Sequence, residues 1–69
     1  MKIAENINNF VVENRIPKGR LAKKSGMTEN ALSLSLNGKR KLNAEEYLNI
    51  CDALCVSYDF FIKRYHENR

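Results

Sequence analysis

Apolar residues keep helical spacing along the whole chain, and this periodicity restricts the possible folds more than any other feature. Residues 3–15 show it, with apolar side chains at positions i, i+4, i+7 and i+8 of one helix face: Ile3, Ile7, Phe10 and Val11. No segment alternates apolar and polar residues for long enough to propose a strand. The sequence therefore predicts an all-α fold, a compact bundle of five short helices.

Pro17 and the glycines separate the first helices. The first helix is predicted over residues 3–15 and should stop before Pro17, because a proline steers the preceding residue out of the helical region. A second helix is predicted to begin near Pro17 or Lys18, since proline is tolerated in a first turn. It closes at Gly26, which can adopt the left-handed conformation found at helix ends.

A third helix is predicted over about residues 28–37, with Thr28 as its N-cap and Asn37–Gly38 as its end. Its inner face carries small and apolar residues: Ala31, Leu32, Ser35 and Leu36. Its other side chains point elsewhere: Glu29, Asn30, Ser33, Leu34 and Asn37.

Asn43 and Glu46 have the spacing of a capping box, which predicts the start of a fourth helix. The core face of this helix is predicted at Tyr47, Leu48, Cys51 and Leu54, with Cys55 as a further candidate. Ser57 is predicted to cap a final helix that carries a set of apolar side chains: Tyr58, Phe60, Phe61, Ile62 and Tyr65.

With 69 residues we expect one domain, residues 1–69, with a thin core. Cys51 and Cys55 lie four residues apart in a predicted helix, whose geometry opposes a disulfide between them. His66 is the single histidine and no carboxylates cluster around the cysteines, so we expect no metal and no cofactor. We interpret both cysteines as small apolar residues on a buried face, kept as free thiols in a reducing compartment.

The longest unbroken apolar runs have only three or four residues, too few for a signal peptide or a membrane span. We therefore expect a cytoplasmic protein.

Positive charge is concentrated in the middle of the chain. Between Arg15 and Lys41 there are eight basic residues and one acid, which gives +7, whereas the rest has four basic and seven acidic residues, which gives −3. Such an asymmetry is expected of a phosphate-facing surface on an otherwise acidic domain. A solvated basic face without a partner is the alternative.

The second and third predicted helices meet the physical demands of a helix-turn-helix. The turn needs a residue without a β-carbon penalty, which is Gly26, and the close crossing needs a small residue, which is Ala22. The next helix needs an apolar inner side, supplied by Leu32 and Leu36, so that its outer side is left for the major groove of DNA.

On these residues the chain resembles the lambda-repressor-like, Cro and XRE-type helix-turn-helix family, over nearly its whole length. Residues 21–28 (Leu-Ala-Lys-Lys-Ser-Gly-Met-Thr) look like the family's first motif helix and turn. Residues 32–40 (Leu-Ser-Leu-Ser-Leu-Asn-Gly-Lys-Arg) look like its recognition helix and the loop after it. Residues 53–61 (Ala-Leu-Cys-Val-Ser-Tyr-Asp-Phe-Phe) look like the segment before the last helix.

Two positions depart from the family pattern. The family usually has an apolar residue where Ser35 stands, so we expect the third helix to pack loosely there. The family often has glycine where this chain has Cys55, so this cysteine must either adopt a strained left-handed conformation, at a cost of about 1 kcal/mol, or shift the helix end.

The resemblance implies two kinds of DNA contact, and the alternative for each residue is an ordinary solvated side chain. Base edges would be read by the outer face of the third helix: Glu29, Asn30, Ser33 and Leu34. Phosphates would be held by residues at helix ends and in the basic loop: Lys18, Thr28, Asn37, Lys39, Arg40 and Lys41.

The apolar residues after Ser57 exceed what one short helix can bury. Phe61 is predicted to belong to the core, while Phe60, Ile62 and Tyr65 are candidates for a twofold dimer interface. Ordinary core packing with chance exposure is the alternative.

Together these features predict a DNA-binding transcriptional regulator of the phage-repressor or Cro type, which acts as a homodimer on an operator in double-stranded DNA. The alternative is an antitoxin-type protein whose main partner is a toxin. No paired carboxylates, nucleophile with a base, or metal cluster is present, so we do not expect an enzyme.

Overall fold

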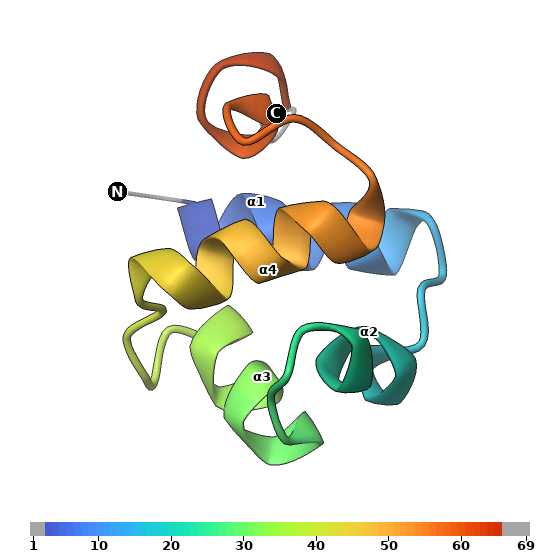
Figure 1. Ribbon diagram of the computed structural model, residues 1–69, viewed down its shortest axis with the longest axis vertical. Helices are drawn as coiled ribbons and strands as arrows, with labels where there is room; N and C mark the ends of the chain where they lie inside the picture. Colours follow the sequence, from blue (N-terminus) through green and yellow to red (C-terminus); the bar gives the residue numbers. More distant parts are fainter. Residues whose placement is uncertain (1–2, 66–69) are drawn as a thin grey trace.

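The computed structural model describes residues 3–65, and all regular structure in that range is helical, as predicted (Figure 1). The five helices are α1 (Ile3–Glu13), α2 (Lys18–Lys24), α3 (Glu29–Leu36), α4 (Ala44–Leu54) and η1 (Phe60–Arg64), the last a single π-helical turn. The radius of gyration is 10.8 Å, close to the about 11 Å expected for a globule of this length. None of the helices within residues 3–65 is long and apolar enough to cross a membrane.

The other four helices are arranged around α1. In Figure 1, α4 lies in front of α1, α2 and α3 lie below this pair, and η1 lies above it. α2 contacts both α3 and α4, and α1 contacts α3 and η1. In this view α3 and η1 therefore lie on opposite sides of α1.

The first four helices end in the same way, with an N–H that donates to the carbonyl five residues earlier. The bonds are Ile16 to Val11 (2.9 Å), Met27 to Ala22 (2.9 Å), Lys39 to Leu34 (2.9 Å) and Val56 to Cys51 (3.1 Å). In each case the residue before the donor has a positive φ: Arg15 (54°), Gly26 (72°), Gly38 (79°) and Cys55 (60°).

Two of these endings were predicted at the glycines and are confirmed. Cys55 takes the first of its two predicted alternatives, the strained left-handed conformation. The prediction for α1 was wrong by two residues, because the left-handed Arg15 ends the helix at Glu13, before Pro17 can do so.

Both predicted N-caps of the middle helices are confirmed. The Thr28 hydroxyl accepts from the Ala31 N–H at 3.1 Å. Asn43 and Glu46 form the full capping box, with bonds of 2.8 and 3.1 Å between each side chain and the other residue's N–H. The cap predicted at Ser57 is wrong, because its hydroxyl donates to the Asp59 carboxylate at 2.7 Å and the helix begins only at Phe60.

Each of the five helices contributes at least one buried apolar residue to the core. Its buried apolar residues are Ile7, Val11, Leu21, Ala22, Leu32, Leu36, Ile50, Cys51 and Phe61. The predicted core face of α4 needs three corrections: Leu48 is 39% exposed, Cys55 is exposed, and Ile50, which the prediction left out, is fully buried. The buried stripe passes through Ile50 and Cys51, which turns Leu48 outward, and Cys55 lies beyond the last helical turn.

The final turn is held to α1 by contacts across the whole sequence. The Asn6 amide, itself buried, donates to the Phe61 carbonyl at 3.1 Å. The Tyr65 hydroxyl donates to the Glu13 carboxylate at 2.9 Å. Phe10 packs edge-on against Phe61, with ring centroids 5.5 Å apart.

Candidate nucleic-acid interface

α2 and α3 are joined by a tight turn at Gly26. Its φ of 72° suits glycine, and the Met27 N–H bond to the Ala22 carbonyl closes α2. Leu21 and Ala22 of α2 are buried together with Leu32 of α3. This packing turns one face of α3 into the core and leaves the opposite face on the outside of the molecule, at the bottom of Figure 1.

All four predicted base-reading residues lie on α3, outside the buried core. Glu29 and Asn30 are exposed, and Ser33 and Leu34 are partly buried. The Glu29 side chain extends towards α2. One of its carboxylate oxygens lies 3.2 Å from the point that a β-carbon on Gly19 would occupy. The absence of a side chain at Gly19 therefore gives this carboxylate its room.

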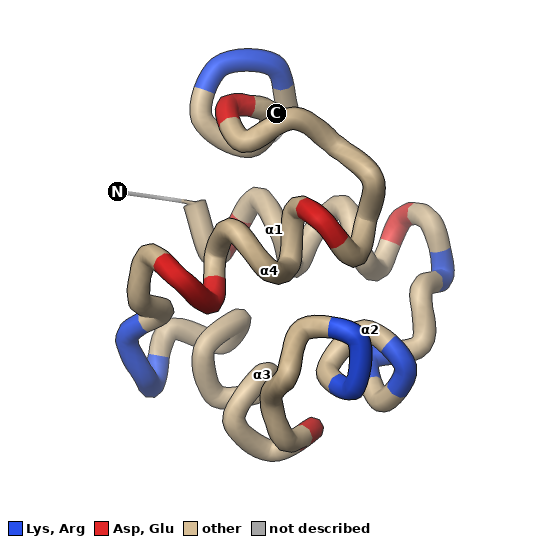
Figure 2. Tube along the Cα trace, in the orientation of Figure 1, with Lys and Arg blue, Asp and Glu red and all other residues tan. Residues whose placement is uncertain are grey.

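Basic residues occur in two groups along this part of the chain. The α2 cluster consists of Lys18, Arg20, Lys23 and Lys24, and the loop cluster consists of Lys39, Arg40 and Lys41. In the view of Figure 2 these clusters lie on opposite sides of α3, while α3 itself carries a single acid and no basic residue. In this view, the positive segment predicted from the sequence is thus divided by α3 into two groups.

The predicted phosphate contacts lie in or beside these clusters. Lys18 is the first residue of α2, and Thr28 is the exposed N-cap of α3. Asn37 and Lys39 are exposed just beyond the end of α3, and Lys41 is exposed further along the loop. Arg40 differs from the three predicted lysine anchors, because its guanidinium is bonded within the protein.

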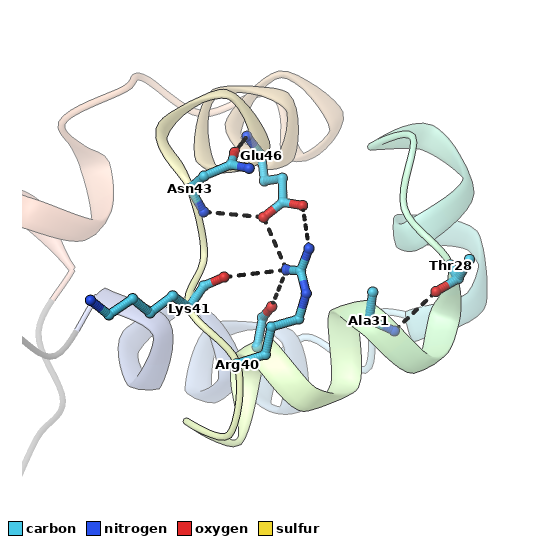
Figure 3. Close-up of polar contacts among 7 residues, drawn as sticks. Thr28, Ala31, Arg40, Lys41, Asn43 and Glu46 are labelled. Carbon is cyan, nitrogen blue, oxygen red and sulfur yellow. Dashed lines mark hydrogen bonds and ion pairs between the residues drawn. The ribbon is translucent and has the colours of Figure 1, made fainter.

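The Arg40 guanidinium forms a bidentate ion pair with the Glu46 carboxylate, with Nη1–Oε1 and Nη2–Oε2 distances of 3.0 and 2.7 Å (Figure 3). The same group donates to the Ser35 hydroxyl at 2.8 Å and to the Lys41 carbonyl at 3.3 Å. The hydrogen bond from Arg40, followed by that from the Asn43 N–H, holds the pKa of the Glu46 carboxyl below its ordinary value. The hydrogen bond to Glu46 likewise raises the pKa of Arg40.

Ser35 is fully buried, and its hydroxyl is satisfied by this bond from Arg40. We expected loose packing at the position where the family usually has an apolar side chain. A buried hydroxyl without a partner would be costly, and Arg40 supplies that partner here. The sequence showed the polar residue at Ser35 but not which side chain would reach it.

The three candidates for a dimer interface have different surroundings. Phe60 and Tyr65 both pack against Phe10, with ring centroids 5.3 and 5.5 Å apart. Ile62 is 42% exposed, and it borders a groove of about 500 Å³ that Ile3 and Leu42 also line. Intramolecular packing thus engages Phe60 and Tyr65, and Ile62 has the most open surface of the three.

Cys51 and Cys55 are both free thiols. The prediction that both lie on a buried face is wrong for Cys55, which is exposed. Cys51 is buried, which raises the pKa of its thiol. Within residues 3–65, no group of three histidine, cysteine or acidic side chains is placed to hold a metal ion.

Comparisons with protein-family models, with curated proteins and with solved structures found no match to this chain.

Proposed function

We propose that this protein binds double-stranded DNA sequence-specifically and regulates transcription as a repressor of the phage-repressor or Cro type. α2, the Gly26 turn and α3 would act as a helix-turn-helix, with α3 in the major groove. The observation that carries the proposal is the position of α3, which has no basic residue of its own, between the two basic clusters (Figure 2).

The dimensions of duplex DNA explain why this arrangement matters. The major groove is about 12 Å wide, and an α-helix with its side chains is about 10–12 Å across. A helix in the groove therefore has a phosphate strand on each side. The α2 cluster would meet one strand and the loop cluster the other, which is the arrangement that releases counterions and drives binding.

The outer face of α3 would supply selectivity rather than affinity. Asn30 can bond the edge of an adenine with both amide atoms, and Leu34 can contact a thymine methyl. Ser33 and Glu29 would add contacts to neighbouring bases, Glu29 as an acceptor from cytosine. Since α3 carries no positive charge, most of the binding free energy would come from the flanking lysines and helix ends.

A second copy of the chain would double these contacts, because helix-turn-helix dimers read two half-sites about one DNA turn apart. Ile62 is the candidate that supports such a contact best, since it is the most exposed of the three.

Selection of bound fragments from random duplex DNA, followed by two substitutions, tests the proposal. Asn30→Ala should weaken binding to the selected site by about 1–3 kcal/mol and leave binding to random duplex nearly unchanged. Lys39→Ala should weaken both by a similar factor, because a phosphate contact carries no sequence information.

Two outcomes would count against the proposal. If both variants behave alike on selected and random duplex, the assignment of reading and anchoring residues is wrong. If no sequence is enriched, DNA reading fails, and a protein partner such as a toxin becomes the leading explanation for the fold.

A further inference from the structure

The Arg40 side chain connects three separate parts of the structure. It contacts Ser35 near the end of α3, the Lys41 carbonyl in the basic loop, and Glu46 in the first turn of α4 (Figure 3). Glu46 in turn accepts from the Asn43 N–H at 3.1 Å and so completes the cap of α4. We call Ser35, Arg40, Asn43 and Glu46 the Arg40 network.

Backbone hydrogen bonds do little to fix the conformation of the basic loop. Arg40, Lys41 and Leu42 make no backbone–backbone hydrogen bonds to other described residues. The last such bond before the loop is that of the Lys39 N–H, and the next involves the Asn43 carbonyl. The conformation between them therefore depends on side chains: the Arg40 guanidinium and Leu42, which packs against the core.

The geometry suits a positioning role. A guanidinium matches a carboxylate through two parallel N–H bonds, which fix orientation as well as distance. The Glu46 side chain is 17% exposed and the Arg40 side chain 36%, so the pair is partly shielded from water. Ser35, which also accepts a hydrogen bond from Arg40, is fully buried and cannot move without disturbing α3.

We propose that Arg40 is a positioning residue for DNA recognition: through Ser35 and Glu46 it fixes the loop that presents Lys39 and Lys41 against the end of α3. This inference rests on the proposed function. It also assigns a role to Glu46. From its charge alone, an acid close to a phosphate-binding loop would be expected to weaken DNA binding, whereas here Glu46 strengthens binding because it positions the loop.

The competing account makes Arg40 itself a phosphate contact, as the sequence suggested. Glu46 would then compete with the phosphate for the guanidinium, and removal of its charge would strengthen binding. The two accounts predict opposite signs for the same substitution.

Glu46→Gln separates them. Glutamine keeps the shape of glutamate and can still complete a capping box, so α4 should keep its start while the ion pair is lost. The matched control is Glu45→Gln, which removes the same charge from the preceding residue. Glu45 is exposed and forms no hydrogen bond or ion pair with other described residues.

The measurement is the affinity of each variant for the selected duplex at one salt concentration, with thermal unfolding recorded to confirm that each is folded. Glu45→Gln should leave the affinity unchanged or slightly higher. Glu46→Gln should lower it by about three- to thirtyfold, the range expected when a supporting contact is removed.

Arg40→Lys is the second test, because it keeps the charge and removes the planar fork. A positioning role predicts a loss as large as that of Glu46→Gln, whereas a direct phosphate contact predicts little loss. Affinity that is equal or higher in Glu46→Gln, or retained in Arg40→Lys, overturns the inference while wild-type binding stands. If the wild-type protein shows no selective binding, the proposed function itself has failed.

Discussion

Cys55 is the residue at which local preference and the fold conflict most directly. It holds φ at 60° and ψ at 40° after α4, in a region that costs residues with a β-carbon about 1–2 kcal/mol. The equivalent positions after α2 and α3 are glycines. The sequence exposed this conflict because a cysteine stood where glycine is common. Arg15, with φ at 54°, was missed, because nothing in its residue type marks a left-handed position.

Cys55→Gly should stabilise the protein by about 0.5–1 kcal/mol. This net gain is the backbone strain that glycine relieves, minus the entropy cost of the extra freedom that glycine gives the unfolded chain. The side chain is exposed, so its removal sacrifices little packing. The measurement is urea unfolding of the substituted and wild-type proteins. Cys55→Ala is the control: it removes the thiol, keeps the β-carbon and should change stability little. An equal gain in both variants would mean that the thiol, not the backbone, is the cause.

At the scale of elements, the sequence predicted best those helices whose ends are set locally. Thr28 and Asn43 cap α3 and α4 through bonds three residues away, and such spacings can be recognised in a sequence. η1 was predicted only as an ordinary helix with the wrong cap. Its position depends on Asn6 and Phe10 of α1, more than 45 residues earlier in the chain, and no local pattern encodes such contacts.

Substitutions in η1 distinguish packing from self-association. Phe60→Ala should lower the free energy of unfolding by about 2–3 kcal/mol, because the ring is lost from the cluster around Phe10. Ile62→Ala should cost less than about 0.5 kcal/mol in stability, because the side chain is exposed. In sedimentation at rising concentration, the wild-type protein should form a weak dimer that Ile62→Ala weakens further.

A strictly monomeric wild-type protein, binding a single half-site as tightly as a palindrome, would remove the dimer from the proposal. It would leave DNA binding by α3 intact. A Phe60→Ala variant that kept its stability and lost only its dimer would instead place the interface at Phe60.

At the scale of the whole molecule, the sequence predicted that positive charge would be concentrated around the second and third helices. It could not predict that this charge would form two clusters on either side of α3 (Figure 2). Nor could it predict that Arg40 would pair with Glu46, since these residues and Ser35 meet only once α3 and α4 have packed. The predicted reading residues lie on α3, and the predicted anchoring residues lie on α2, at the ends of α3 or in the basic loop, where Arg40 is bonded to Glu46 and Ser35.

The affinity for duplex DNA as a function of salt concentration tests the central claim most directly. If about six to eight side chains and helix ends meet phosphates, a plot of log affinity against log salt should be linear with a slope of about −5 to −7. Lys39→Ala should reduce the slope by about one. A flat plot for the wild-type protein would contradict the account, because a surface that binds DNA through two basic clusters must release counterions when it does so.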